Sequence, residues 1–203
     1  MKEKTPLKKI LNYVAFLVSM ILSPYVTAAV FIVLIVYRYS ESFTQFLPWM
    51  LTFFFFGIVI PGSYILWLME LKKINDIHIA NQKDRRIPFI ITGISSLAGA
   101  ILLSVFGAAR QVVLISMIWA ANAIAIALIT QAWKISVHMA MFSAVATITV
   151  VLFGWHMWWL YLLLIPLAWS RIYRKCHTLW QTTAGALLAF AITVLTFKIF
   201  GYI

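Results

Sequence analysis

The chain has 203 residues, of which 64% are hydrophobic and only 10% are charged. A soluble domain carries roughly 25% charged residues, so this chain has too little polar surface to cover itself in water. The composition excludes a soluble globular domain, a disordered chain and a disulfide scaffold. It predicts an all-α, polytopic bundle of transmembrane helices, with residues 1–203 forming a single integral membrane domain.

Seven apolar stretches follow a basic N-terminal head, and each is long enough, or nearly so, to cross a bilayer as a helix of about 20 residues. We predict spans at roughly Ile10 to Tyr37, Phe46 to Met69, Pro88 to Phe106, Gln111 to Ala132, Lys134 to Phe153, His156 to Trp169 and Thr178 to Phe200. The third and sixth stretches are short. A bundle of six spans with one re-entrant segment is therefore the alternative to seven spans.

Proline and small residues inside these stretches predict local features of the bundle. Pro24 lies inside the first span and is expected to kink it, which membrane helices tolerate. Gly93, Gly99 and Gly185 lie inside later spans, where small residues allow two helices to approach closely. We expect close helix packing at these three glycines.

The charge balance is strongly basic, with 16 Lys and Arg residues against 5 Asp and Glu residues. In a soluble protein this balance would suggest nucleic acid. Here the bases lie in short loops beside apolar spans, which favours attraction to anionic lipid and excludes a nucleic-acid partner. With seven spans and the N-terminus inside, all bases except Arg38, Arg110 and Lys198 fall on the inner side. We expect a bacterial inner or plasma membrane protein, and the positive-inside rule predicts that its N-terminus and polar loops are cytoplasmic.

Three polar clusters interrupt the apolar sequence, and two predicted spans separate each cluster from the next. Because each pair of spans crosses the membrane and returns, all three clusters are expected at one membrane face. Their members are His78, Arg85 and Arg86 in the first cluster, Lys134, Ser136 and His138 in the second, and Ser170, Arg171, His177 and Gln181 in the third.

The side chains of these clusters suit a phosphate group. Lys134 and His138 are four residues apart, as are His177 and Gln181, so each pair is expected to share a helix face. One guanidinium group can donate two parallel hydrogen bonds to two phosphate oxygens. Histidine can act as a nucleophile or general acid near neutral pH. The clusters contain no carboxylate pair and no Cys/His metal set, so we expect neither a metal nor a cofactor.

The spacing in the third cluster resembles a motif of the type 2 phosphatidic acid phosphatase superfamily. Ser170-Arg171-x5-His177 resembles the superfamily's third motif, in which an aspartate stands where this chain has Gln181. Ser136 and His138 are similar to the Ser and His of its second motif, Pro-Ser-Gly-His. The resemblance covers a motif-bearing core at residues 76–200.

The first motif of that superfamily ends in Arg-Pro and is resembled more loosely by the run from Arg85 to Pro88. His78 lies seven residues before Arg85, where the superfamily has lysine. The motifs follow the same order in this chain and in the superfamily.

The resemblance implies a metal-independent membrane phosphatase, or phosphotransferase, acting on a lipid phosphate such as phosphatidic acid or a polyprenyl (di)phosphate. It implies that His177 attacks phosphorus and forms a phosphohistidine, that His138 protonates the leaving lipid oxygen, and that Gln181 orients His177. The phosphate-binding residues it implies are Arg171, Arg85, Arg86, Lys134, Ser136 and His78.

Departures from the motifs keep other functions open. Gln181 replaces the aspartate, and Ile135 and Val137 stand where the second motif has proline and glycine. The alternative is therefore a catalytically weak or inactive membrane protein that binds lipid phosphates. A transporter is a weaker alternative because all five acids lie near or outside span ends, and a prenyltransferase with Asp-rich magnesium sites is weaker still. The oligomeric state is not predicted.

Overall fold

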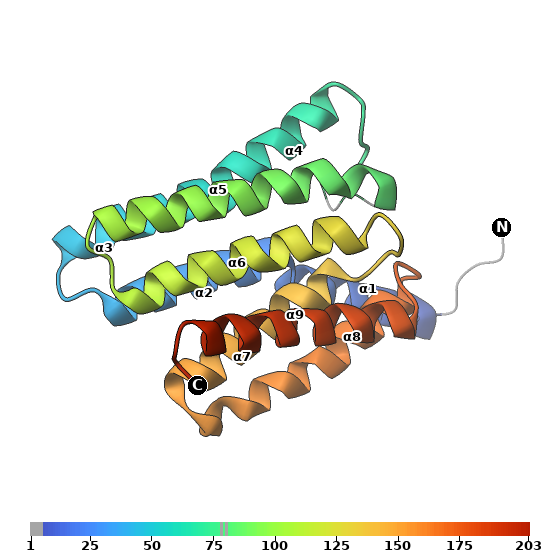
Figure 1. Cartoon of the computed structure of the whole chain (residues 1–203). Helices are drawn as coiled ribbons and strands as arrows, with labels where there is room; N and C mark the ends of the chain where they lie inside the picture. Colours follow the sequence, from blue (N-terminus) through green and yellow to red (C-terminus); the bar gives the residue numbers. More distant parts are fainter. Residues whose placement is uncertain (1–5, 78, 80) are drawn as a thin grey trace. The chain divides into compact units, whose positions relative to one another are not determined.

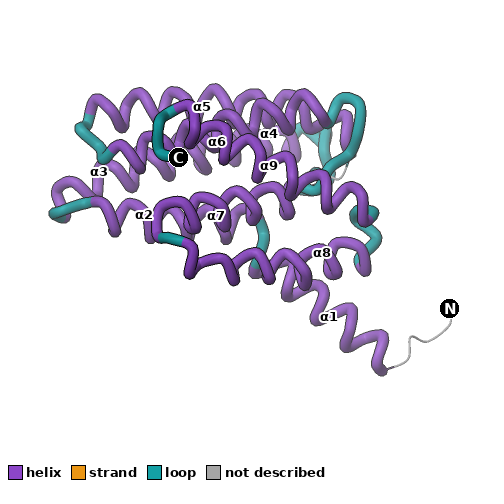
Figure 2. The backbone as a smooth tube through the Cα atoms, turned by 60° about the horizontal axis from the view of Figure 1, so that its bottom comes forward, coloured by secondary structure: helices purple, strands orange, loops and turns teal. Residues whose placement is uncertain are grey.

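The computed structural model describes residues 6–77, 79 and 81–203, and the described residues form helices joined by loops, without a strand (Figure 2). The chain divides into two compact units, and each unit is assembled from segments that lie far apart in the sequence. The first unit is Met1–Thr27 with Ile135–Ala191, and the second is Ala28–Lys134 with Ile192–Ile203. The all-helical prediction is confirmed for the described part of the chain.

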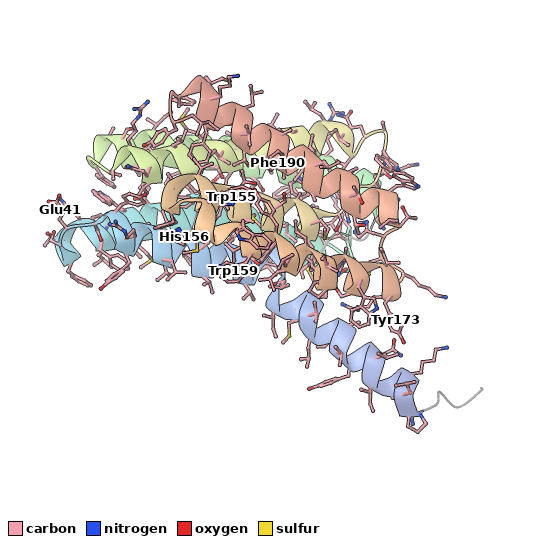
Figure 3. All side chains as sticks on the ribbon, turned by 90° about the horizontal axis from the view of Figure 1, so that it is seen from below. Glu41, Trp155, His156, Trp159, Tyr173 and Phe190 are labelled. Carbon is pink, nitrogen blue, oxygen red and sulfur yellow. The ribbon has the colours of Figure 1, made fainter. Side chains whose placement is uncertain are left out.

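The first unit contains α1 (Pro6–Ile21), α7 (Val137–Phe153), the 3₁₀-helix η3 (Trp155–Leu163), α8 (Leu164–Tyr173) and the first part of α9 (Leu179–Ile199). Figure 1 labels the α-helices. Helix α8 packs against α1, α7 and η3. A hydrophobic core of the first unit contains Met139 and Phe142 from α7 and Leu167 from α8, all of them buried. Trp155 and Trp159 project from η3 and are exposed (Figure 3), as expected of amphipathic rings at a membrane surface.

The second unit contains α2 (Pro24–Tyr39) from Ala28 onward, α3 (Phe43–Phe54), the π-helix η1 (Phe55–Val59), α4 (Ile60–Glu70), the 3₁₀-helix η2 (Gln82–Arg85), α5 (Arg86–Val105), α6 (Arg110–Ile129) and the end of α9. Helices α5 and α6 lie side by side (Figure 1). The hydroxyl of Ser116 on α6 donates to the backbone carbonyl of Ser96 on α5 at 2.8 Å. This bond gives the hydroxyl of Ser116 an acceptor, which lipid tails do not provide.

Close packing at the predicted glycines is confirmed. A Cβ added at Gly99 would lie 2.7 Å from Cβ of Phe56 in η1, and one added at Gly93 would lie 2.5 Å from Cδ1 of Ile124 in α6. In the first unit, a Cβ at Gly185 would lie 2.6 Å from the carbonyl oxygen of Ser136. These separations are shorter than ordinary contacts, so an added side chain would force the neighbouring atoms to move at each of these three crossings.

Four helical segments are long and apolar enough to cross a membrane, and a fifth is gained if α1 and α2 are one span bent by 40°. The bend lies just before Pro24, where a kink is predicted. Helix α7 is apolar but has only 17 residues, and the sixth predicted span consists of η3 and the short α8. The described helices are compatible with an integral membrane protein, while the count of six or seven spans stays a prediction.

Candidate functional site

The beginnings of α7 and α9 meet in the first unit. The backbone N–H of Ser136, directly before α7, donates to the backbone carbonyl of Gln181 in the first turn of α9 at 3.0 Å. Gly185, one turn further along α9, leaves room for the backbone of Ser136. Residues of the second and third sequence clusters are therefore held together by main-chain contact.

Gln181 also contacts His177, which is buried at 7% exposure just before α9 begins. The backbone N–H of Thr178 donates to Oε1 of Gln181 at 3.1 Å, which identifies the facing amide atom as the oxygen. The same oxygen lies 3.3 Å from Nδ1 of His177. Because Oε1 can only accept, the proton of the neutral ring belongs on Nδ1 and the lone pair lies on Nε2.

Arg171 lies in the last turn of α8 and is buried at 7% exposure. Its Nη1 donates to the hydroxyl of Ser19 on α1 at 2.6 Å. The carbonyl oxygen of Arg171 accepts from the backbone N–H of Cys176 at 3.0 Å and of His177 at 3.4 Å. The loop after α8 thus folds back and places His177 beside the backbone of Arg171.

The N-terminus of α7 is buried, and the side chain of the residue before it, Ser136, makes no hydrogen bond to the first turn of the helix. Ser136 is fully buried, its side chain makes no cap hydrogen bond, and its hydroxyl has no hydrogen-bond partner among the described residues. His138, the second residue of α7, is 3% exposed. The first amides of a helix lack partners within the helix, and the helix dipole makes this end positive, so a buried N-terminus suits an anion.

The remaining predicted residues belong to the second unit or lie outside the described residues. Arg85 is buried at 4% exposure, and its Nε donates to the carbonyl of Ile79 at 2.8 Å, whereas Arg86 is exposed. Lys134 is half-buried in the second unit. His78 lies outside the described residues, so its predicted role is not addressed by the structure.

One prediction about the second cluster is wrong. Lys134 and His138 were expected to share a helix face, but α7 begins at Val137, so Lys134 lies in the preceding loop. The backbone N–H of Ser136 is bonded to α9 instead of continuing a helix. His177 likewise precedes α9, and its contact with Gln181 is made across the helix start instead of along one face.

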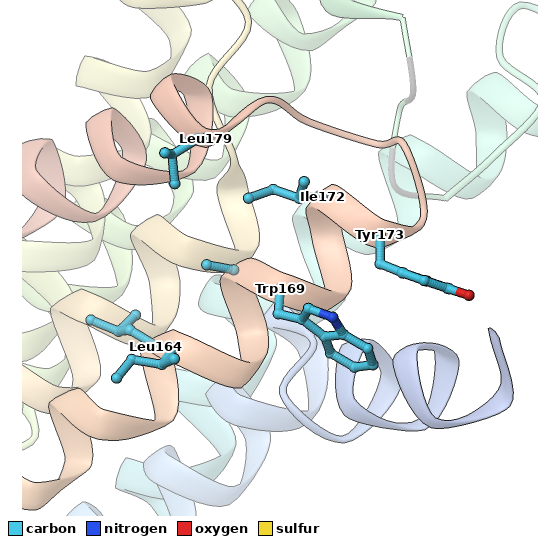
Figure 4. A pocket seen from close by; sticks show the side chains of 7 residues that line it. Leu164, Trp169, Ile172, Tyr173 and Leu179 are labelled. Atoms are coloured by element: carbon cyan, nitrogen blue, oxygen red, sulfur yellow. The ribbon is translucent and has the colours of Figure 1, made fainter. Parts of the chain in front are cut away.

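An open, apolar groove of about 570 Å³ lies on α8 (Figure 4). It is lined by α8 and by Leu179 at the start of α9, so Ile172 and Leu179 lie on either side of the loop that carries His177. Its lining residues are Leu164, Ile165, Ala168, Trp169, Ile172, Tyr173 and Leu179. A hydrocarbon chain could lie there with its polar end near this loop.

The charge of the first unit favours an anionic ligand. Its described residues, 6–27 and 135–191, contain no Asp or Glu and carry Lys8, Lys9, Arg171, Arg174 and Lys175. Within the part of the chain that the structure describes, no group of three His, Cys, Asp or Glu side chains could hold a metal ion. The polar side chains of the first unit described above are two imidazoles, a guanidinium, an amide and hydroxyls.

One residue of this site carries no signal in the sequence. Ser19 is a single serine in an apolar helix and matches no motif, yet it is buried and bonded to Arg171. Only the packing of α1 against α8 reveals it. Comparisons with known proteins add no relative: no family model, no curated protein and no solved structure matches this chain.

Proposed function

We propose that the chain is a metal-independent membrane phosphatase that hydrolyses a lipid phosphate through a phosphohistidine, with a core at residues 76–200 like that of the type 2 phosphatidic acid phosphatase superfamily. In this proposal the chain crosses a bacterial inner or plasma membrane six or seven times. The motif loops face the cytoplasm, the substrate is a lipid phosphate and the surrounding lipids are its other partners.

The observation that carries the proposal is the double contact of Gln181. Its backbone carbonyl holds Ser136 at the start of α7, and its side-chain oxygen lies 3.3 Å from Nδ1 of His177. One residue therefore links an uncapped helix N-terminus, which suits a phosphate, to a histidine whose lone pair lies on Nε2. Phosphoryl transfer requires a nucleophile positioned beside an anion site, and Gln181 contacts both.

In the first step, Nε2 of His177 attacks phosphorus. The N–P bond forms as the bond between phosphorus and the lipid oxygen breaks, and His138 gives its proton to that leaving oxygen. Gln181 keeps the proton on Nδ1, so the attacking nitrogen is the correct one. The products of this step are the free lipid alcohol and a phosphohistidine.

In the second step, water replaces the histidine. His138, now neutral, takes a proton from the water as its oxygen attacks phosphorus, and the N–P bond breaks. Inorganic phosphate leaves and both imidazoles return to their starting state. Fixed positive charge stabilises the transferring group in both steps; Arg171, the amides of α7 and the hydroxyl of Ser136 provide donors in the first unit.

The sequence motifs add Arg85, Arg86, Lys134 and His78 to the proposed phosphate ligands. Of the two adjacent arginines, Arg85 is the better candidate because it is buried and its Nε is fixed by the carbonyl of Ile79. Lys134 and His78 complete the proposed set. The groove along α8 favours a lipid over a soluble phosphate ester, because its apolar lining ends beside the loop that carries His177.

A second candidate is a lipid-phosphate-binding protein with little turnover. The observation that favours it is the neutral side chain of Gln181, which orients His177 but cannot stabilise an imidazolium by charge. Loss of the carboxylate in a comparable triad lowers the rate roughly 10⁴-fold. Binding of phosphate without release of product would distinguish this candidate from a phosphatase.

The test uses the purified full-length chain with phosphatidic acid in mixed micelles containing EDTA, and it measures inorganic phosphate. We expect release by the unchanged protein and a loss of roughly 10³-fold or more in His177→Ala. His156→Ala is the matched control, because His156 is exposed on η3 outside the site, and it should keep full activity. A polyprenyl diphosphate in place of phosphatidic acid tests the substrate class.

Two outcomes would decide against the proposal. Full activity in His177→Ala would remove the phosphohistidine mechanism. Binding of orthovanadate, a phosphate analogue, without any phosphate release from either lipid would favour the second candidate.

A further inference from the structure

A residue outside all three motifs contacts the candidate phosphate site. Ser19 lies on α1, far in sequence from the motif-bearing core at residues 76–200, and its side chain is buried at 3% exposure. Its hydroxyl accepts a hydrogen bond of 2.6 Å from Nη1 of Arg171. We infer that Ser19 is a positioning residue that fixes the guanidinium of Arg171 for phosphate binding, an inference that rests on the proposed function.

Two contacts fix the register of α1 against α8. Ser19 contacts Arg171, and the ring of Phe16 lies 5.3 Å from the guanidinium carbon of Arg174. Phe16 and Ser19 are three residues apart on one face of α1. Arg171 lies in the last turn of α8, and Arg174 is the residue directly after that helix. Phe16 precedes Ser19 in the chain, whereas its partner Arg174 follows Arg171, so α1 and α8 run antiparallel.

The chemistry of the contact suits a binding arginine. A carboxylate in the place of Ser19 would orient the guanidinium and also cancel much of its charge. The hydroxyl orients one nitrogen of the fork through a charge-assisted hydrogen bond and, being neutral, does not cancel its positive charge. Guanidinium recognition of phosphate depends on the plane of the fork, so a fixed plane reduces the entropy lost on binding.

The backbone of Arg171 also holds the loop that leads to His177. Its carbonyl accepts the backbone N–H groups of Cys176 and His177, while its side chain reaches α1. Ser19 therefore acts on the guanidinium without a contact to the nucleophile. We expect removal of its hydroxyl to weaken phosphate binding more than it lowers the maximal rate.

The experiment measures orthovanadate binding by titration to the full-length protein in detergent, with phosphatidic acid hydrolysis as a second readout. Ser19→Ala should weaken vanadate binding roughly tenfold, the effect of losing one charge-assisted hydrogen bond, and should raise KM more than it lowers kcat. Ser19→Thr, which keeps the hydroxyl, should bind vanadate within roughly threefold of the unchanged protein.

Ser143→Ala is the matched control. Ser143 is also a buried serine of the first unit, and its hydroxyl donates across helices to the carbonyl of Ala186 at 2.8 Å. Ser143→Ala removes a buried serine hydrogen bond between two helices without touching Arg171, so vanadate affinity should not change. Thermal unfolding of each variant separates loss of folded protein from loss of binding.

The background variant Arg171→Lys completes the test. Lysine lacks the planar fork, so Ser19→Ala in that background should have little further effect on vanadate affinity. Unchanged affinity in Ser19→Ala, or an equal loss in both backgrounds, would overturn the inference while leaving the proposed function standing. Absence of both vanadate binding and turnover in the unchanged protein would instead overturn the proposed function, and the inference with it.

Discussion

Gly185 and Ser136 lie in backbone contact. A Cβ at Gly185 would lie 2.6 Å from the carbonyl oxygen of Ser136, 3.2 Å from its nitrogen and 3.3 Å from its carbonyl carbon. All three atoms belong to the main chain at the start of α7, where no flexible side chain can move away. The position of the uncapped helix N-terminus therefore depends on the absence of a side chain at Gly185.

Gly185→Ala should displace the start of α7 from α9. The added methyl group must push the backbone of Ser136 away, and overpacking of this kind costs about 1–3 kcal/mol. We expect a lower thermal unfolding temperature and a loss of phosphate release of at least roughly tenfold. Gly62→Ala is the control, because a Cβ at Gly62 meets no atom within 4 Å. Equal effects of the two variants would contradict this account.

Gln181→Glu should raise turnover if the chain is a phosphatase. Glutamate has the same length as glutamine, so its oxygen can still accept from Thr178 and from Nδ1 of His177. The added charge stabilises the imidazolium that forms during the reaction, and we expect a gain of roughly tenfold or more in kcat. Gln181→Ala, which removes the acceptor, should lower kcat. A glutamate variant that binds vanadate but shows no gain would favour the binding protein.

The helical class and most helix positions could be predicted from the sequence. The stretch predicted from Gln111 to Ala132 corresponds to α6 at Arg110–Ile129. An apolar run of about 20 residues fits a helix that crosses the bilayer, in which every backbone group is bonded internally. The break before Pro24 and the close crossings at Gly93 and Gly99 follow from the residues themselves.

The variants of helical hydrogen bonding could not be predicted. Phe55–Val59 forms a π-helix, and Trp155–Leu163 forms a 3₁₀-helix, although both have ordinary apolar sequences. In the π-helix, the carbonyl of Phe56 accepts a hydrogen bond of 2.5 Å from the hydroxyl of Ser95 on α5. This bond from another helix depends on tertiary packing, and the periodicity of a single segment does not contain it.

The site could be predicted in part. The alternation of spans predicts that the second and third clusters lie at one membrane face, and the bond between Ser136 and Gln181 joins a residue of each cluster. The convergence of Arg85 and Lys134 with them stays a prediction. Ser19 could not be predicted, because one serine in an apolar helix is usually a packing residue. The helix face proposed for Lys134 was wrong because main-chain bonding to α9 fixes where α7 begins.

Arg85→Lys and Arg86→Lys should differ in their effects. Arg85 is buried and its Nε is held by the carbonyl of Ile79 at 2.8 Å, whereas Arg86 is exposed. Lysine keeps the charge but loses the oriented fork, so phosphate release should fall roughly tenfold or more in Arg85→Lys and remain near normal in Arg86→Lys. Kinetics on phosphatidic acid in mixed micelles measure both. A larger loss in Arg86→Lys would assign phosphate binding to the exposed arginine.

Gly99→Ala should destabilise the second unit more than Gly93→Ala does. At Gly99 the new methyl group meets Cβ of Phe56, which is fixed to the backbone of η1, so helices α5 and η1 must separate. At Gly93 its nearest neighbours are the Cδ1 and Cγ1 atoms of Ile124, which a change of rotamer can move. We expect a loss of about 2–3 kcal/mol at Gly99 and about 1 kcal/mol at Gly93, measured by thermal unfolding in detergent. The reverse order would mean that the side chain of Ile124 is held more rigidly than the start of the π-helix.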